Sequence, residues 1–429
     1  MEETPLIIDN GSYEIKFGLA GADEPYRALN AIARDKYGNF HLSNQINSIK
    51  DISSVSFKRP HELGQLVSWE LESQIWDYCF YNPDEFYGWT MDSTRGKHLV
   101  ASESCMTMPE LSKNMDQVVF EECEFATMFK APVPTFVPFA VNDATAHVLQ
   151  AKSDNDSDNS SEKNPQIVEE DSKADKNYKD FELVIDSGFN CTWIVPVIKG
   201  VPYYKAVKKL DIGGRFLNGF LRETLSFRHY NVMDETILVN NIKETCLFMS
   251  PNSYFDSFQS KLKTAKEYVL PDFNTSFKGY VRQPGQKIPE DSQTIVLQDE
   301  LFSVPETFLH PEIASLLSPG IIETILESVS MLPEALRPLM ISNIVVTGGN
   351  FNIPNFASRL ATELQRQCPT DWSCRLFVPR GDKTTYGWHC MKQFSSTQSY
   401  LDSRVTRDEY YEHGVEWCTA KRFGYQAWL

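Results

Sequence analysis

The sequence lacks the features of a membrane protein, a secreted protein or a zinc-stapled domain. No apolar run approaches the roughly 18–20 residues of a membrane-spanning helix. The N-terminal stretch MEETPLIIDN is acidic and has no basic region before its apolar run, so we do not expect a secretory signal. The nine cysteines form no Cys-x-x-Cys pair, and the eight histidines show no His-Glu-x-x-His spacing. A disulfide framework and a zinc site are therefore disfavoured, and reduced thiols in the cytosol or nucleus fit best.

Basic residues are also scarce. The chain has 41 Lys and Arg residues against 58 Asp and Glu residues, a net charge of −17. This balance disfavours direct, phosphate-led binding of nucleic acid. It favours either a basic partner or simply solubility. With 41% hydrophobic residues the chain is expected to fold, and 429 residues exceed what one core usually holds, so we predict two domains.

The segment 151–180 differs in composition from the rest of the chain. It contains nine acidic residues and five lysines but one aromatic residue and two branched aliphatic residues. This composition predicts a disordered acidic insertion or linker. It is either a solvated spacer or a tract that binds basic proteins.

A pattern near the N-terminus recurs after this segment. Residues 6–18 read LIIDNGSYEIKFG and residues 183–195 read LVIDSGFNCTWIV, and each has an apolar run, an Asp, a polar residue and a Gly. Helical spacing is found at 69–80, 216–225 and 355–364, and 343–347 is a short apolar run typical of a buried strand. Alternating strands and helices indicate the α/β class. The repeat predicts two related halves with a ligand cleft between them.

The first repeat has the chemistry of a phosphate-binding hairpin. Asn10-Gly11 is expected to take the positive backbone dihedrals of a tight turn, and a glycine there lets N–H groups approach a phosphate. Asp9 could hold Mg²⁺ directly or through water, and Lys16 could place a charge on a phosphate oxygen. A plain hairpin explains one copy equally well. Two copies, with Asp186 and Gly188 in the second, favour a clamp on a polyphosphate from both sides.

A third loop follows the predicted strand at 343–347. Gly348 and Gly349 stand between that strand and the predicted helix at 355–364. Their lack of a side chain would allow a ligand to approach the backbone closely. A Gly-Gly turn of this kind is also common in loops that bind nothing.

These three elements, in this order, resemble the actin fold that is shared with the sugar kinases and the seventy-kilodalton heat-shock chaperones. The resemblance to actin covers nearly the whole chain outside 151–180, and it includes the stretches 210–215, 242–244 and 405–414. It implies an α/β, actin-like fold in which two related, ribonuclease-H-like domains enclose a nucleotide cleft. It implies ATP or ADP with Mg²⁺ as the cofactor, with Asp9 toward the metal. The implied nucleotide-binding residues are Asp9, Asn10, Gly11, Ser12, Tyr13, Lys16, Asp186, Ser187, Gly188, Phe189, Asn190, Gly214, Lys243, Glu244, Gly348, Gly349 and Asn350.

The departures from actin concern hydrolysis and assembly. Tyr13 replaces the second glycine of the first loop, and Trp193 stands where actin has a histidine that helps to position the attacking water. The segment 132–142, where the catalytic glutamine is expected, contains no Gln. Hydrolysis needs a group that orients water, and an indole N–H can donate a hydrogen bond but cannot act as a base. The third loop continues Asn350-Phe351-Asn352-Ile353, unlike actin, and the early region is shorter than actin's and lacks its filament-forming loop. We therefore expect no enzyme activity, or weak hydrolysis at most, and no filament.

Within the superfamily the chain is most similar to the actin-related protein 6 class, through the stretches 117–122, 185–189 and 225–236. That resemblance implies a nuclear subunit, with a cytoplasmic pool as an alternative, of a Swr-type chromatin remodeller. Such a complex replaces nucleosomal histone dimers by dimers carrying the Z-type variant. The implied partners are a small HIT-type zinc-finger subunit and, through the complex, histones and the nucleosome. Direct contact with DNA stays open, and no membrane is implied.

Two other functions remain alternatives. The chain could be a slow ATPase in its own right, since Asp9 and Asp186 are retained, or a cytoskeletal filament former. We expect the first half at 1–150, the insertion at 151–180, the second half at 181–380 and a C-terminal segment at 381–429 that returns to the first half. The apolar tail 423–429 either contacts a partner or folds back on its own domain, while Trp69 and Trp76 are expected in the core.

Overall fold

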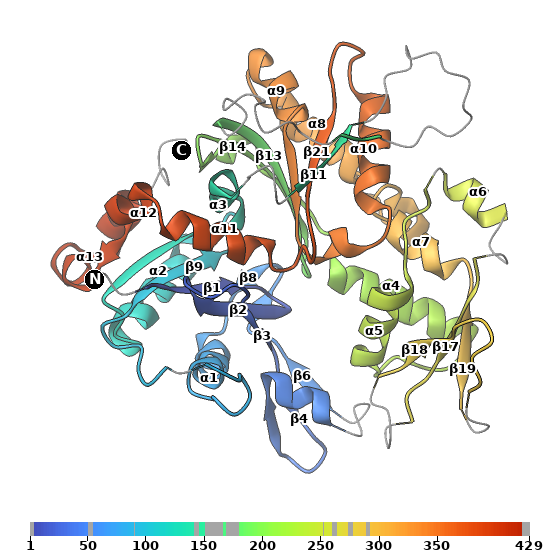
Figure 1. Cartoon of the computed structure of the whole chain (residues 1–429), viewed down its shortest axis with the longest axis horizontal. Coiled ribbons are helices and arrows are strands. Elements are labelled where there is room, and N and C mark those ends of the chain that lie inside the picture. The colour runs from blue at the N-terminus through green and yellow to red at the C-terminus, as the bar shows by residue number, and fades with distance from the viewer. Residues whose placement is uncertain are drawn as a thin grey trace.

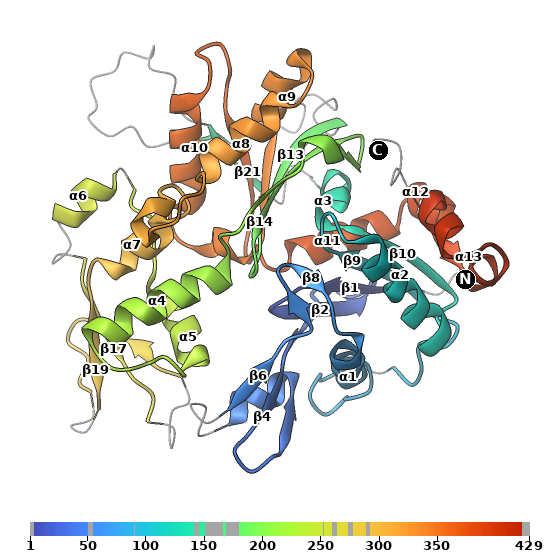
Figure 2. The same ribbon diagram turned by 180° about the vertical axis from the view of Figure 1, so that it is seen from behind.

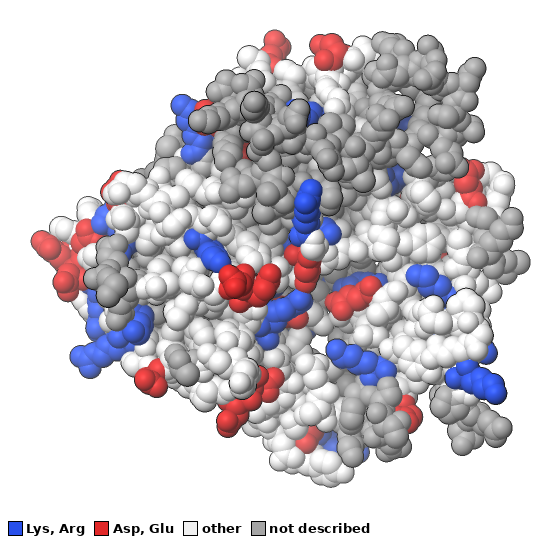
Figure 3. Space-filling model, in the orientation of Figure 1, with Lys and Arg blue, Asp and Glu red and all other residues white. Residues whose placement is uncertain are grey.

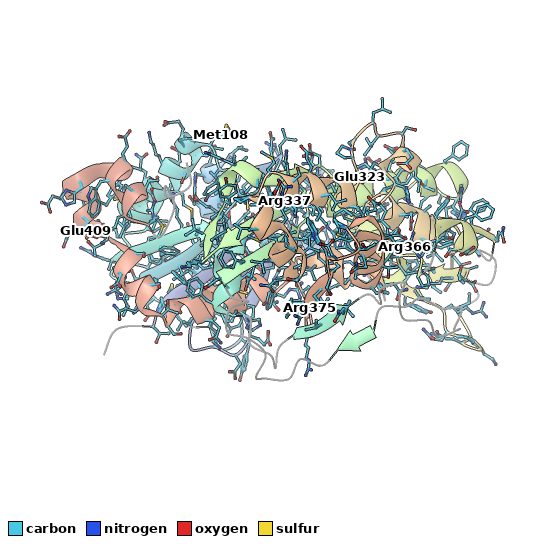
Figure 4. The ribbon with its side chains drawn as sticks, turned by 90° about the horizontal axis from the view of Figure 1, so that it is seen from above. Met108, Glu323, Arg337, Arg366, Arg375 and Glu409 are labelled. Atoms are coloured by element: carbon cyan, nitrogen blue, oxygen red, sulfur yellow. The ribbon has the colours of Figure 1, made fainter. Side chains whose placement is uncertain are left out.

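The computed structural model describes residues 4–49, 55–89, 91–140, 146–150, 166–168, 180–251, 253–259, 264–272, 278–288 and 292–422. Two lobes lie side by side around two large sheets (Figure 1). Seen from above, Met108 and Glu409 lie toward one end of the molecule, and Glu323 and Arg366 lie toward the other (Figure 4). The predicted tail contact at 423–429 lies outside the described residues.

The first lobe is built on a six-stranded sheet. Its strand order is β22-β10-β9-β1-β2-β3, and β1 pairs antiparallel with β2 and parallel with β9. All five residues of β1 are buried, as expected for an apolar run in the middle of a sheet. The strands are β1 (Leu6–Asn10), β2 (Glu14–Leu19), β3 (Tyr26–Leu29), β9 (His98–Glu103), β10 (Thr127–Pro132) and β22 (Val405–Thr406).

The second lobe is built on a larger sheet of the same design. Its order is β12-β11-β21-β20-β13-β14-β15, and β16 also pairs with β14. Like β1, β13 is antiparallel to the strand that follows it and parallel to the strand on its other side. The strands are β11 (Ala146–Gln150), β12 (Gln166–Val168), β13 (Phe181–Ser187), β14 (Thr192–Ile198), β15 (Val201–Pro202), β16 (Lys208–Leu210), β20 (Ile344–Thr347) and β21 (Arg375–Pro379). The α/β fold of two related halves is thus confirmed.

Two expected boundaries are wrong. β11 was expected in the first half, but it pairs with β21 in the second sheet. Residues 166–168, within the predicted insertion, form β12 and pair with β11. The short apolar stretch Ile167-Val168 is therefore part of an edge strand, and the rest of 151–179 lies outside the described residues.

Helices cover both sheets. The predicted helices at 69–80 and 216–225 are confirmed within α1 and α4, and that at 355–364 is confirmed as α10, which begins one residue later. The first lobe carries α1 (Trp69–Phe80), α2 (Pro109–Gln117), α3 (Val133–Phe136), α11 (Tyr386–Ser395), α12 (Gln398–Ser403) and α13 (Arg407–Lys421). The second carries α4 (Gly214–Arg228), α5 (Thr236–Cys246), α6 (Tyr254–Gln259), α7 (Glu300–Glu306), α8 (Ile321–Ser330), α9 (Arg337–Ile341) and α10 (Phe356–Gln367). No helix in these described parts is long and apolar enough to cross a membrane.

Each lobe has its own hydrophobic core, and a third core joins them. The joining core combines Ile7 and Phe129 of the first sheet with Val184 and Val345 of the second. Trp388 on α11 is fully buried in it, and its indole N–H donates to the carbonyl of Ile7 at 3.2 Å. The floor between the lobes is therefore continuous packed protein. Trp76 belongs to the core of the first lobe, as predicted, whereas Trp69 is partly buried and packs against that core.

Small sheets extend the outer ends of both lobes. On the first lobe they are β4 (Ile32–Arg34), β5 (Phe40–Leu42) and β6 (Ser56–Lys58), and the hairpin of β7 (His61–Glu62) and β8 (Gln65–Leu66). On the second they are β17 (Lys266–Val269), β18 (Tyr280–Val281) and β19 (Thr294–Leu297). Seen from behind, β8 lies beside the tip of the β13–β14 hairpin (Figure 2). Acidic and basic side chains are interspersed over the face in Figure 3, without a large area of one sign.

Candidate functional site

A cavity of about 650 Å³ lies between the two lobes. Loops at the ends of β1, β9, β13 and β20 line it, and α5 forms one wall. It is therefore at the carboxyl ends of strands from both sheets, where α/β proteins usually bind ligands. Of the seventeen predicted nucleotide-binding residues, all but Ser187 line it.

The β1–β2 hairpin fixes Asp9 at the cavity. Asp9 is the register partner of Lys16, whose Nζ lies 3.4 Å from Asp9 Oδ2. Ser102 at the end of β9 donates from its hydroxyl to Asp9 Oδ1 at 3.0 Å and accepts from the backbone N–H of Asn10 at 2.8 Å. The carboxylate is thus held in place by the neighbouring strand.

The predicted turn geometry of this hairpin is wrong. Gly11 does not have a positive φ, because four residues connect the register pair Asn10–Ile15 and no mirror-image two-residue turn is needed. Glycine is required here for space, since a Cβ atom at Gly11 would lie 2.6 Å from the carbonyl oxygen of Glu14 and 3.2 Å from Lys16 Nζ. The missing side chain therefore leaves the loop backbone and Lys16 open to a ligand.

The β13–β14 hairpin has the same loop length, with Ser187 and Thr192 as its last register pair. Ser187 is fully buried, and its hydroxyl shares a hydrogen bond of 2.7 Å with Thr192 and accepts from Asn350 Nδ2 at 3.0 Å. Contrary to the prediction, its side chain does not line the cavity. It fixes the second loop from behind.

The third loop packs directly on the second. Gly348 has a φ of 96°, and a Cβ atom there would lie 2.2 Å from the carbonyl oxygen of Ser187. Asn350 also donates to the carbonyl of Gly188 at 2.8 Å. The close approach that Gly348 permits here is to the neighbouring hairpin. Gly348 also lines the cavity, and its approach to a ligand stays a prediction.

Two carboxylates, Asp9 and Asp186, line the cavity from equivalent positions of the two hairpins. Burial, and then repulsion from Asp9, raises the pKa of Asp186 to about 7, although the Lys16 ammonium lowers it in part. Such a pair favours a bound divalent cation over two free negative charges. The described residues form no set of three or more His, Cys, Asp or Glu side chains suited to a metal. Mg²⁺ would thus be held by Asp9 and Asp186 together with water and ligand oxygens, and it would neutralise phosphate charge when bound.

Trp193 occupies the position in the second hairpin that Lys16 occupies in the first. It is the register partner of Asp186 and lines the cavity. From the stretch where a catalytic glutamine was expected, the described part 132–140 forms the end of β10, α3 and a short turn, and it contributes Val133 to the lining. Neither side chain can accept a proton from water.

The wall formed by α5 carries the predicted Lys243 and Glu244. Lys243 is buried, and burial lowers the pKa of its ammonium to about 8, although the Glu244 carboxylate opposes this shift. Its Nζ lies 3.5 Å from the carbonyl oxygen of Gly214. The cation is therefore placed beside the glycine that opens α4 onto the cavity.

Sequence reasoning missed Arg59 and Asn240. The guanidinium of Arg59 lies over the rings of both Tyr13 and Phe189, and Asn240 donates to the hydroxyl of Tyr13. No motif marks either residue. The only signal was that Tyr13 and Phe189 are large side chains within loops that are otherwise small and polar.

Comparison with known proteins agrees with this arrangement. Residues 1–423 match the actin family. The chain belongs to the actin family. It is 63% identical to the Actin-like protein ARP6 of Saccharomyces cerevisiae and 60% identical to that of Kluyveromyces lactis, and each comparison covers 100% of both chains. It is 30% identical to the Actin-related protein 6 of Neurospora crassa, over 97% of this chain and 94% of the other. The predicted family and its actin-related protein 6 branch are confirmed.

Proposed function

We propose that this actin-family protein is a non-catalytic, nucleotide-binding subunit of a Swr-type chromatin remodeller. In that complex it supports nucleosome binding and the replacement of histone dimers by Z-type variant dimers. It acts in the nucleus, beside a small HIT-type zinc-finger subunit. Its similarity to actin-related protein 6 chains over their whole length supports this assignment.

One observation carries the nucleotide-binding part of the proposal. The loops of both hairpins and the third loop converge on one cavity, with Asp9, Lys16 and Asp186 toward it. Glycines leave the loop backbone open, Lys16 supplies a cation for a phosphate, and the carboxylates suit Mg²⁺. ATP or ADP bound there contacts both lobes at once. Binding to the folded state alone would stabilise it by about 4 kcal/mol at a thousandfold excess over Kd.

The non-catalytic part rests on Trp193 and Val133, which line the cavity where a water-orienting group is needed. A slow ATPase is the second candidate, because the raised pKa of Asp186 suits a group that accepts a proton. Trp193→His separates the two. If hydrolysis was lost because Trp193 replaces a histidine, this substitution increases the rate of ATP turnover. If Asp186 already supports hydrolysis, turnover is measurable in the native chain and the substitution changes it little.

Two experiments test the proposal. The protein is purified without added nucleotide, denatured, and its nucleotide content measured by ion-exchange chromatography, with Asp9→Ala as the comparison. We expect close to one ATP or ADP per native chain and a large loss in the variant; an empty native protein contradicts the nucleotide assignment. Affinity capture of the endogenous protein should recover remodeller subunits and histones. Recovery of cytoskeletal proteins in their place, or pelleting that rises with concentration in ATP and Mg²⁺, supports a filament former.

A further inference from the structure

Besides the shared core, the two lobes contact each other across the cavity. The ring of Tyr13, in the β1–β2 loop, lies 4.9 Å from the ring of Phe189, in the β13–β14 loop, at an interplanar angle of 44°. Asn240 on α5 donates from Nδ2 to the Tyr13 hydroxyl at 2.9 Å. A side chain of the first lobe is thus held by two residues of the second.

Arg59 completes this contact from the first lobe. Its Cζ lies 4.8 Å from the centre of the Tyr13 ring and 5.0 Å from that of Phe189. Its Nη1 donates to the carbonyls of Ser12, Tyr13 and Asn30 at 3.2, 3.1 and 2.9 Å. The guanidinium therefore fixes the loop that carries Tyr13 and attracts the rings of both lobes.

Other contacts between described residues of the two lobes lie away from this ring pair. Arg27 and Asp382 pair at 2.7 Å, but their side chains are 42% and 38% exposed, so the pair contributes about 0–1 kcal/mol. Ile237 on α5 packs against the small apolar cluster of Ala31, Ala33, Ile46 and Ile49. The contact among Tyr13, Phe189 and Arg59, by contrast, directly connects the β1–β2 loop with the β13–β14 loop.

We propose that Tyr13, Phe189, Arg59 and Asn240 form an interlobe clasp, which holds the cleft closed without a nucleotide and limits exchange of a nucleoside di- or triphosphate. Its ligand class rests on the proposed function, whereas its effect on lobe opening does not. A phosphate chain between the two loops cannot leave until the loops separate, and separation breaks the ring pair, the cation–ring contacts and the Asn240 hydrogen bond together. Loss of a ring pair and a cation–ring contact is expected to accelerate opening about tenfold or more.

The test uses variants from both sides of the clasp. Tyr13→Gly removes the ring from the first lobe, Phe189→Leu removes it from the second, and the double variant removes both. Tyr87→Ser is the matched control, because Tyr87 is an aromatic residue of the first lobe that is 96% exposed. Thermal unfolding confirms that each variant is folded, and Phe189→Leu answers the question alone if Tyr13→Gly does not fold.

Two measurements are made on each protein. Hydrogen exchange of the nucleotide-free protein reports opening at the amides of residues 11–13 and 188–190. Stopped-flow release of a fluorescent ADP analogue reports exchange of the ligand. We expect each single variant to accelerate hydrogen exchange and release of the ADP analogue by about tenfold. Hydrogen exchange should be faster in the mutated loop and also in the loop that was not mutated. Because the two substitutions break the same contact between Tyr13 and Phe189, the double variant should open no faster than the faster single variant.

The outcomes separate this inference from the proposed function. If the native chain binds no nucleotide but the amides respond as described, the clasp stands and the nucleotide assignment fails. The clasp is overturned if each variant affects only its own loop, if the two effects multiply, or if Tyr87→Ser gives the same acceleration.

Discussion

At the residue scale, Glu72 contacts the β1–β2 loop through Asn30, whose Nδ2 also donates to the carbonyl of Gly11 at 3.0 Å. The Glu72 side chain is fully buried on α1, and its Oε1 accepts from Asn30 Nδ2 at 3.3 Å. Its Oε2 has no hydrogen-bond partner within the described residues. Burial raises its pKa to about 7, although the polar side chains of Asn10, Asn30 and Trp76 nearby oppose this shift. A neutral carboxyl therefore lies beneath the loop at low pH and a buried charge at high pH.

This predicts a specific pH dependence of stability. Since the folded pKa of about 7 exceeds the unfolded value of 4.5, the folded state binds more protons between the two, and stability falls as pH rises through that window. From pH 6 to pH 8 the loss is about 1 kcal/mol. The Glu72→Gln side chain cannot ionise and does not undergo this loss. The free energy of unfolding of the variant, measured in urea, should therefore gain about 1 kcal/mol on that of the native chain between pH 6 and pH 8. A constant difference between the two proteins would show that Glu72 is ionised throughout.

At the element scale, the third loop is locked to the second hairpin by Gly348. Gly348→Ala forces a positive φ on an L-residue and drives Cβ into the carbonyl of Ser187, so we expect destabilisation of about 3 kcal/mol or more. Gly285→Ala is the control, since Gly285 has a similar φ of 80° but no atom within 4 Å of the added Cβ. That variant should lose only about 1 kcal/mol. Equal midpoints of thermal unfolding for the two variants would mean that backbone strain alone matters and that the loops are not locked.

Some of the secondary-structure elements could be predicted from the sequence, and others could not. Apolar runs and helical spacing are local signals, so the hairpins at 6–18 and 183–195 and the helices α1, α4 and α10 were predictable. Pairing of β11 with β21 joins residues more than two hundred positions apart along the chain, and local patterns do not carry such a contact. The place of β12 in the sheet depends on this pairing, because β12 pairs with β11. The same holds for Ser187 and Gly348, whose roles arise from the packing of one loop on another. Resemblance to actin located the cavity residues, but only the structure brought Arg59 and Asn240 to Tyr13.

At the scale of the whole molecule, a core joins the two lobes, and the cavity that binds the proposed nucleotide lies between them. A nucleotide that bridges them should therefore raise the stability of both lobes together. Removal of nucleotide and Mg²⁺ by EDTA and desalting is expected to lower the thermal midpoint, and added ATP or ADP with Mg²⁺ should restore it in a concentration-dependent manner. Asp9→Ala should show a small response to either. If the native midpoint does not respond, the cavity does not hold a nucleotide that stabilises the fold.

We propose that this protein holds a nucleotide but does not turn it over. The most direct test is to incubate the nucleotide-free chain with a stoichiometric amount of labelled ATP and Mg²⁺, and to follow ADP formation for several hours. We predict that the native chain retains ATP tightly and forms ADP no faster than Asp9→Ala does. The rate of ADP formation should increase, if at all, only in Trp193→His. Repeated turnover by the native chain that disappears in Asp9→Ala would show that this protein is an ATPase.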